Sequence, residues 1–234
     1  MLLLIILFIF FTSCEDTKKS TTNSEKILTE TPQIKKSETE IKKEKTTKKF
    51  PIITQDNLVE FLTAYGKDNP ETKVRISTSL GIIDLKLFKD TPLHRANFIY
   101  LVKQGYFNET FFHRVSPNFI IQAGSSDLKS TFKKRAEIGG NYTLPYEKGN
   151  GRIHQSGTVS GAKEYRENPD NRSAPFEFFI FLGPKSSTAH LNGKYTIFGK
   201  VTKGMDVVES ISKLPADDGE WPIDNLYITA EIIE

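Results

Sequence analysis

The sequence predicts a mainly β fold: a closed eight-stranded antiparallel β-barrel with two flanking helices, preceded by a short extra helix. Eight short runs are strand-like, and the first two alternate apolar and polar residues in the manner of strands. Only two helical segments lie among these runs, so strands and helices do not alternate as they do in a parallel βαβ sheet. The length of 234 residues suits one such domain with extensions.

The strand-like runs cover much of the chain beyond residue 72. Ser79-Leu80-Gly81 separates the first two runs and predicts a hairpin between them. The eight runs span residues 73–78, 82–88, 111–115, 119–122, 157–162, 176–182, 195–201 and 226–233.

Two helices are predicted within the barrel domain. Thr91-Pro92 provides an N-cap and a proline at the first helical position, and Gly105 ends the helix that follows. Its apolar side is supplied by residues between 96 and 102. The second helix covers residues 205–212.

A shorter helix is predicted ahead of the barrel, over residues 56–65. Apolar residues recur there at helical spacing, from Leu58 to Tyr65, and Gly66 is a plausible stop. We expect residues 50–72 to form an extension that packs on the domain at residues 73–234.

The first eleven residues, MLLLIILFIFF, are wholly apolar and lead to Thr12-Ser13-Cys14. A bilayer needs about 20 helical residues, so this run suits the hydrophobic part of an export signal rather than a span. Small residues before a cysteine resemble a bacterial lipobox, which implies cleavage after residue 13 and a lipid on Cys14. The alternative is a buried apolar N-terminus with an ordinary Cys14. The lipobox reading places the protein in the bacterial cell envelope, lipid-anchored and either periplasmic or surface-exposed.

Residues 14–49 are predicted to be a disordered tether rich in Lys, Thr, Ser and Glu, because few aliphatic side chains are available to order it. Residues 15–49 hold ten lysines and seven acidic residues, a net charge of +3, so the rest of the chain carries 22 charges of each sign. A nucleic-acid-binding domain would concentrate positive charge. The balanced charge argues against nucleic acid as a partner.

The composition also argues against cofactors and metal. One cysteine cannot form an intramolecular disulfide, and the four histidines have no ligand-like spacing. No Gly-rich loop ends in Lys-Ser or Lys-Thr, so no nucleotide is implied. We expect no cofactor, no metal and a monomer.

One stretch carries most of the functional information. Residues 111–124 read FFHRVSPNFIIQAG and resemble the FHR…FxxQGG signature of cyclophilin-type peptidyl-prolyl cis-trans isomerases. Later segments match that family in the same order: residues 157–162 (GTVSGA), 176–180 (FEFFI), 191–201 (LNGKYTIFGKV) and 204–205 (GM). The resemblance covers residues 73–234 and implies a cyclophilin-like barrel that acts on proline-containing polypeptides, here in folding envelope proteins.

The chemistry fits these residue types. An X-Pro amide rotates slowly, with a barrier of about 18–20 kcal/mol, because resonance gives its C–N bond double-bond character. A catalyst needs only a pocket for the proline ring and a donor aimed at the twisted amide. The resemblance makes Arg114 the principal catalytic residue, with Gln122 bonding the substrate and Arg114. His113 is predicted to be structural, because rotation needs no proton transfer.

The resemblance also supplies the substrate-binding residues. Phe119, Ile120, Phe179 and Leu191 would form the proline pocket, and Ala162 would line the peptide groove. Core packing is the alternative role for each of them. It is favoured for the neighbours Phe112, Phe178 and Ile180, because strand alternation points Phe179 away from Phe178 and Ile180.

Four further binding positions depart from the best-known members of the family. Glu177 stands where glutamine is usual, Lys163 where asparagine is usual, Tyr195 where histidine is common, and His190 where tryptophan is common. A carboxylate at position 177 can pair with Arg114, or can compete with the substrate for it. Two functions therefore stay open: an active isomerase, and a weakly active or inactive barrel that binds Pro-containing segments as a chaperone.

Overall fold

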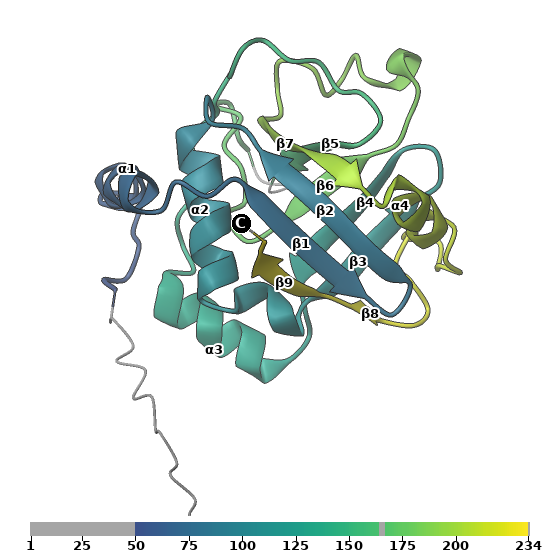
Figure 1. Cartoon of the computed structure of the whole chain (residues 1–234), viewed down its shortest axis with the longest axis horizontal. Helices are drawn as coiled ribbons and strands as arrows, with labels where there is room; N and C mark the ends of the chain where they lie inside the picture. Colours follow the sequence, from purple (N-terminus) through teal and green to yellow (C-terminus); the bar gives the residue numbers. More distant parts are fainter. Residues whose placement is uncertain (1–49, 164–166, 234) are drawn as a thin grey trace, which may run out of the picture. The chain divides into compact units, whose positions relative to one another are not determined.

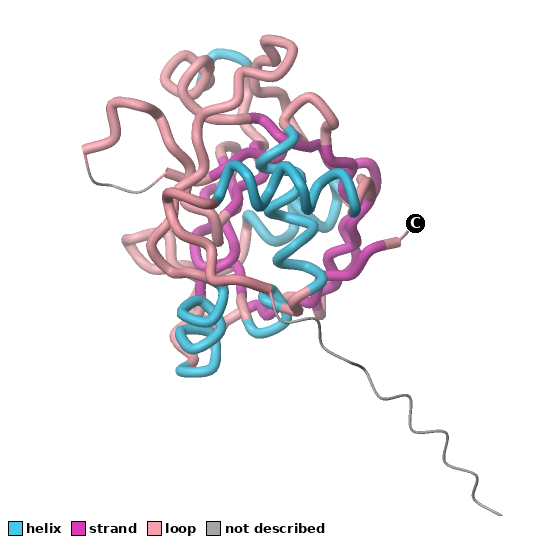
Figure 2. The backbone as a smooth tube through the Cα atoms, turned by 90° about the vertical axis from the view of Figure 1, so that its left-hand side faces the viewer, coloured by secondary structure: helices cyan, strands magenta, loops and turns pink. Residues whose placement is uncertain are grey.

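The computed structural model describes residues 50–163 and 167–233. Nine strands form one antiparallel sheet in the order β8-β3-β4-β6-β5-β7-β2-β1-β9. In Figure 2 the strands form a ring with helices drawn across it, which confirms the predicted mainly β barrel with flanking helices. The strands are β1 (Lys73–Thr78), β2 (Gly81–Leu87), β3 (Phe111–Ser116), β4 (Ile120–Ser125), β5 (Thr158–Gly161), β6 (Phe178–Phe181), β7 (Ile197–Lys203), β8 (Leu226–Tyr227) and β9 (Thr229–Ile232).

The strand count is nine instead of the predicted eight, because the last predicted strand divides in two. β8 pairs with β3, whereas β9 pairs with β1 at the other edge of the sheet. Ile228, between them, is buried and donates its N–H to Thr110 O at 2.9 Å instead of joining either strand. This single residue carries the chain from one edge to the other and nearly closes the barrel.

Helices α2 (Pro92–Lys103) and α4 (Met205–Ser212) lie at opposite sides of the strands in Figure 1. α2 is buried from His94 to Val102, since it faces the main core. Thr91 is the N-cap and Pro92 the first helical residue, as predicted, but the Thr91 side chain forms no capping hydrogen bond. The carboxylate of Glu147 instead accepts the N–H groups of Leu93 (3.0 Å) and His94 (2.9 Å). A negative charge there also suits the positive end of the helix dipole.

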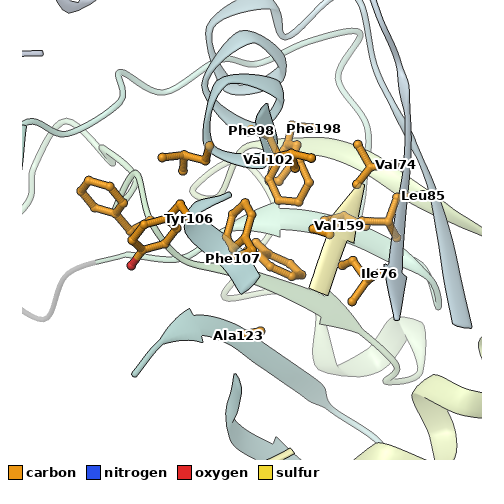
Figure 3. Close-up of a cluster of buried hydrophobic side chains, with 14 of the residues drawn as sticks. Val74, Ile76, Leu85, Phe98, Val102, Tyr106, Phe107, Ala123, Val159 and Phe198 are labelled. Carbon is orange, nitrogen blue, oxygen red and sulfur yellow. The ribbon is translucent and has the colours of Figure 1, made fainter. Parts of the chain in front are cut away.

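Strand alternation divides the apolar side chains into two clusters. In β6, Phe178 and Ile180 enter the main core, whereas Phe179 and Phe181 belong to a second cluster on the other face. Figure 3 shows the main core, where side chains from β1, β2 and β5 meet those of α2 and the turn η1 (Tyr106–Glu109). The second cluster consists of Ile120, Ala162, Phe179, Phe181 and Leu191, with Phe119 and Tyr195 packed against it. The alternation argument for Phe179 is thereby confirmed.

Helix α1 (Leu58–Asp68) forms the N-terminal extension, and it runs two residues past the predicted stop at Gly66. A Cβ at Gly66 would lie 3.0 Å from Ala96 Cβ, so the missing side chain allows α1 to pack closely against α2. The helix ends at Asp68, just before Asn69-Pro70, because a residue that precedes proline disfavours helical geometry. Burial of Leu58 and Leu62 in the main core shows that α1 is packed on the barrel.

Helix α3 (Lys129–Ile138) was not predicted, because it is polar nearly all round. Only Thr131 and Ile138 are buried, and Phe132 is exposed, so no apolar periodicity marks it. Gly139 ends α3 with φ +129°, where a Cβ would lie 2.0 Å from Ile53 O. Ile53 N–H donates to Ile138 O at 2.8 Å, so the extension is also fixed to α3. The remaining short element is the turn η2 (Lys185–Ser187).

Among the described residues, the buried side chains of the hydrophobic core run from Ile53 to Ala230, and partly buried ones such as Phe50 and Ile232 pack against them. The chain from residue 50 onward therefore has a core of its own, as an independently folding domain requires. The predicted signal peptide at residues 1–13, the lipidation site Cys14 and the tether at residues 14–49 lie outside the described residues. Within the described residues, none of the helices has the length and apolarity needed to cross a bilayer.

Candidate active site

One pocket of about 420 Å³ opens over the second apolar cluster. We call it the Arg114 pocket. It is lined by Arg114, Phe119, Ile120, Gln122, Ala162, Lys163, Asn168, Phe179, His190, Leu191 and Tyr195. The structure thus brings together every predicted catalytic or substrate-binding residue of the barrel domain except Glu177.

The floor of the pocket is apolar and rigid. Ile120, Phe179 and Leu191 are each at most 4% exposed, and Phe119 and Tyr195 pack beside them. The ring of His154 lies parallel to that of Phe179, with centroids 5.9 Å apart and an interplanar angle of 8°. Such a preformed apolar slot with polar groups at its rim is typical of a ligand site.

His154 supports this floor from beneath. It is fully buried, with Nδ1 2.9 Å from Asn192 Oδ1 and Nε2 3.1 Å from Ser160 Oγ. Burial lowers the pKa of His154, with the Asn192 hydrogen bond opposing that shift. A neutral ring follows, which suits flat packing on an aromatic neighbour. No local pattern in the sequence marks this role, because Ser160 and Asn192 reach His154 only through the barrel fold.

Arg114 lies at the rim of the pocket, on β3. Its guanidinium carbon is 5.9 Å from the centre of the Phe119 ring, and its side chain is 31% exposed. Nε donates to Glu220 Oε2 at 2.5 Å. Among the described residues, no hydrogen bond engages the two terminal amino groups, so both remain available to a ligand.

Glu220 reaches Arg114 from the loop between α4 and β8. Its backbone is left-handed (φ +64°), and its carbonyl accepts the N–H of Val115 at 2.8 Å, which fixes the loop to β3. Burial would raise the pKa of Glu220, but hydrogen bonds from Ser116 and Arg114 and the charge of Arg114 lower it. The carboxylate therefore stays ionised and holds the guanidinium.

Of the two roles left open for Glu177, pairing with Arg114 is not seen among the described residues. Glu177 lies outside the pocket lining, where its Oε2 accepts Gln122 Nε2 at 2.9 Å and lies 3.6 Å from His113 Nε2. Its Oε1 is 3.8 Å from Arg135 Nη2, on the unpredicted helix α3. Arg135 provides the positive charge beside Glu177, and Arg114 pairs with Glu220.

Gln122 differs from expectation in detail, whereas His113 agrees with it. Gln122 is the cross-strand partner of Arg114, yet its amide donates to Glu177, and no hydrogen bond joins it to Arg114 within the described residues. The register of β3 shifts between Phe112 and Arg114, so simple alternation does not orient His113. His113 contacts Glu177 beneath the site, in agreement with a structural role.

The pocket lining also includes a second cation, Lys163. Lys163 Nζ lies 4.7 Å from the centre of the Tyr195 ring and donates to Asn171 Oδ1. Burial and the nearby charge of Lys194 lower the pKa of Lys163. Asn168, which the sequence did not single out, also lines the pocket, and its side chain forms hydrogen bonds with the backbone N–H and carbonyl of Arg172.

We expect the ionised Glu177 carboxylate to stabilise the folded protein near neutral pH and to lose this contribution as the pH falls. Burial would raise its pKa, but the hydrogen bond and charge of His113, the charge of Arg135 and the Gln122 hydrogen bond lower it. A lowered folded-state pKa adds stability above the unfolded value of about 4.3, and this is lost as pH falls through the folded value. Urea unfolding of wild type and Glu177→Gln from pH 7 to 3 checks this. Wild type should lose more stability below pH ~4.5 than the variant, and parallel curves would contradict the prediction.

The geometry suits stabilisation of a twisted amide. An apolar slot can hold a proline ring while a fixed guanidinium, with free N–H groups at the rim, donates to the amide or its neighbouring carbonyl. Within residues 50–163 and 167–233, no three His, Cys, Asp or Glu side chains are grouped to hold a metal ion. Rotation about the amide needs neither metal nor proton transfer.

Comparison with known proteins supports the same activity. The family model for cyclophilin type peptidyl-prolyl cis-trans isomerase/CLD matches residues 73–231. The chain is 36% identical over 147 residues to a peptidyl-prolyl cis-trans isomerase of Acinetobacter baylyi, covering 62% of this chain and 73% of the relative. It is 32% identical over 170 residues to peptidyl-prolyl cis-trans isomerase A of Dickeya dadantii, covering 71% and 84%.

Solved structures agree with these relatives. A cyclophilin type peptidyl-prolyl cis-trans isomerase of Cryptosporidium parvum has a TM-score of 0.58 and 28% identity, covering 70% of this chain and 98% of its own. A second crystal structure of that protein, in the presence of the dipeptide Ala-Pro, has a TM-score of 0.56 and 29% identity, covering 69% and 99%. The barrel, the Arg114 pocket and these matches lead to one conclusion: the chain belongs to the cyclophilin-type peptidyl-prolyl cis-trans isomerases, enzymes that rotate X-Pro bonds.

Proposed function

We propose that this chain is an exported, lipid-anchored monomeric isomerase that accelerates X-Pro rotation in proteins folding in the bacterial cell envelope. Family membership supplies the reaction. The single observation that carries the mechanism is Arg114, held by Glu220 at the rim of an apolar slot with its terminal N–H groups free of partners among the described residues.

In this proposal the proline ring enters the slot formed by Phe119, Ile120, Phe179 and Leu191. The two free amino groups of Arg114 then donate to the substrate and favour the twisted amide over the planar one. The Gln122 amide nitrogen is bonded to Glu177, and its carbonyl oxygen, which accepts no hydrogen bond from the described residues, can accept a substrate N–H.

The rest of the rim would contact the peptide on either side of proline. Ala162, Lys163 and Tyr195 lie along one side of the pocket, and His190 stands beside Phe119 with ring centroids 5.7 Å apart. A Pro-containing dipeptide accompanied the related Cryptosporidium parvum structure. Proline-containing polypeptides are therefore the proposed substrates.

The direct test is a protease-coupled assay with an Ala-Pro peptide on the chain from residue 50 onward. Turnover above the uncatalysed rate supports an isomerase. The second candidate is a peptide-binding chaperone, and it is favoured by one observation: Glu220 already occupies Nε of Arg114. Saturable peptide binding without turnover would establish that candidate instead.

The anchor is proposed from residues 1–14 alone. Their apolar run and the single cysteine support cleavage and lipidation, which would place the domain at a membrane of the envelope. Labelling with a fatty acid should mark the wild-type chain and not Cys14→Ser. An unlabelled, uncleaved wild-type chain would refute the anchor without affecting the isomerase assay.

Glu220 is expected to position Arg114. Glu220→Ala should lower kcat/KM about ten-fold, because the guanidinium loses the acceptor that fixes its orientation. Glu220→Gln keeps an acceptor and should lose less. Asp218→Ala, which removes the same charge from an exposed neighbour in the same loop, is the control and should stay near wild type. A rise in kcat/KM for Glu220→Ala would mean that this carboxylate competes with the substrate.

A further inference from the structure

Three lysines form a row across the outer face of the barrel. Lys73 of β1 stands opposite Lys86 of β2, and Lys86 stands opposite Lys200 of β7. β1, β2 and β7 are adjacent in the sheet (Figure 1), and all three side chains are exposed. Directly opposite residues have Cβ atoms about 4.5–5.5 Å apart, so Lys86 has a like charge on each side, which is destabilising.

The neighbouring row shows that this charge arrangement is unusual within the same sheet. There Glu231, Arg75, Asp84 and Lys203 follow one another across four strands with alternating sign. Arg75 and Asp84 form a bidentate pair with distances of 2.8 and 2.9 Å. In the lysine row, by contrast, Lys86 and Lys200 form no ion pair with any described residue.

A shallow pocket of about 490 Å³ lies beside the row and adds further positive charge. Its described lining includes Lys73, Lys86, Lys89 and Arg152, against one described carboxylate, Asp90, which pairs with Arg152 at 2.8 Å. It shares no lining residue with the Arg114 pocket. Because residues outside the tether carry balanced charge, this face is a local concentration of cations.

The chemistry of the face favours phosphate-bearing lipid over nucleic acid. Single-stranded nucleic acids need aromatic rings on which bases stack. The one ring among the described lining residues is Phe88, and the Arg152 guanidinium covers it at 3.8 Å from its centre. A row of lysines without such rings matches a membrane surface of anionic headgroups, where each lysine contributes about 1 kcal/mol.

We propose that the face formed by Lys73, Lys86, Lys89, Lys200 and Arg152 docks the barrel on membranes containing anionic phospholipid. The sequence upstream of Phe50 carries the proposed lipid anchor, which would keep the domain within reach of such a surface. The inference goes beyond that anchor, because it assigns membrane contact to the folded domain itself. Attraction of this kind weakens as salt is added.

The test uses the chain from residue 15 onward, which lacks Cys14, and sedimentation with vesicles of phosphatidylcholine containing 30% phosphatidylglycerol. Lys86→Gln/Lys200→Gln should bind about 10- to 30-fold more weakly than wild type, at ~1 kcal/mol per lysine. Lys129→Gln/Lys133→Gln, on exposed positions of α3, removes the same charge and should bind like wild type. Turnover of an Ala-Pro peptide should be the same in all three chains.

Three results would overturn the proposal. The first is equal loss of vesicle binding in both double variants, because overall charge would then explain it. The second is wild-type binding no stronger to the mixed vesicles than to pure phosphatidylcholine. The third is tighter, row-dependent binding to a single-stranded oligonucleotide than to vesicles, which would make this a nucleic-acid surface. None of these outcomes bears on isomerase activity, so the two proposals fail independently.

Discussion

Arg114→Lys is expected to lower kcat/KM for an Ala-Pro peptide by roughly 10²-fold, and Arg114→Ala by up to about 10³-fold, the usual loss when one preorganised donor is removed. Lysine keeps the positive charge but lacks the planar fork of donors. In wild type, Glu220 holds Nε while the terminal amino groups have no hydrogen-bond partner among the described residues, and a single ammonium group cannot both hold Glu220 and donate to a substrate in this geometry. The loss should therefore appear even though the net charge is unchanged.

Arg75→Lys is the matched control for this experiment. Arg75 also donates Nε to a carboxylate, that of Asp84, and its side chain is 32% exposed, close to the 31% of Arg114. It lies on β1, outside the lining of the Arg114 pocket. Its replacement should leave kcat/KM near the wild-type value. Equal activity in Arg114→Lys and Arg75→Lys would remove Arg114 from the mechanism.

The second large effect is expected in stability, from Arg95→Met. Arg95 is 7% exposed and donates to three backbone carbonyls: Gly66 O (2.8 Å), Asn69 O (2.8 Å) and Glu71 O (3.3 Å). These carbonyls end α1 and begin the link to β1. The bond to Gly66 O is buried and the other two are partly buried. A buried acceptor left without a partner costs about 1–3 kcal/mol, so the free energy of unfolding should fall by about 3 kcal/mol.

Urea denaturation measures this loss. Arg75→Met is the control: it removes the partly exposed ion pair with Asp84 and should lower the free energy of unfolding by about 1 kcal/mol or less. If Arg95→Met does not fold, Gly66→Ala tests the same contact, because its Cβ would press on Ala96 and Arg95 and should cost about 1–3 kcal/mol. A change below ~1 kcal/mol in both variants would mean that α1 is not part of the cooperative unit.

The sequence predicted the barrel well where local pattern and tertiary structure agree. Strand alternation separated Phe179 from Phe178 and Ile180, and the structure places them in different clusters for that reason. The ordered motifs likewise located the pocket, because the barrel brings side chains from residues 114–122 and 179–195 together in its lining.

What the sequence left out depends on contacts between distant segments. Glu220 lies 106 residues from Arg114 along the chain, and only closure of the barrel brings its loop to β3. Arg135 sits on a polar helix without apolar periodicity, so its contact with Glu177 left no local signal. Gly66 resembled a helix stop, because its packing against Ala96 is visible only when α1 lies on α2.

The most direct test of the central claim is exchange NMR on an Ala-Pro peptide mixed with a catalytic amount of the chain from residue 50 onward. The uncatalysed exchange takes roughly 10–100 s, so wild type should raise the cis–trans exchange rate well above that limit while Arg114→Ala leaves it almost unchanged. Peptide binding with exchange at the uncatalysed rate would contradict a guanidinium that stabilises the rotating amide.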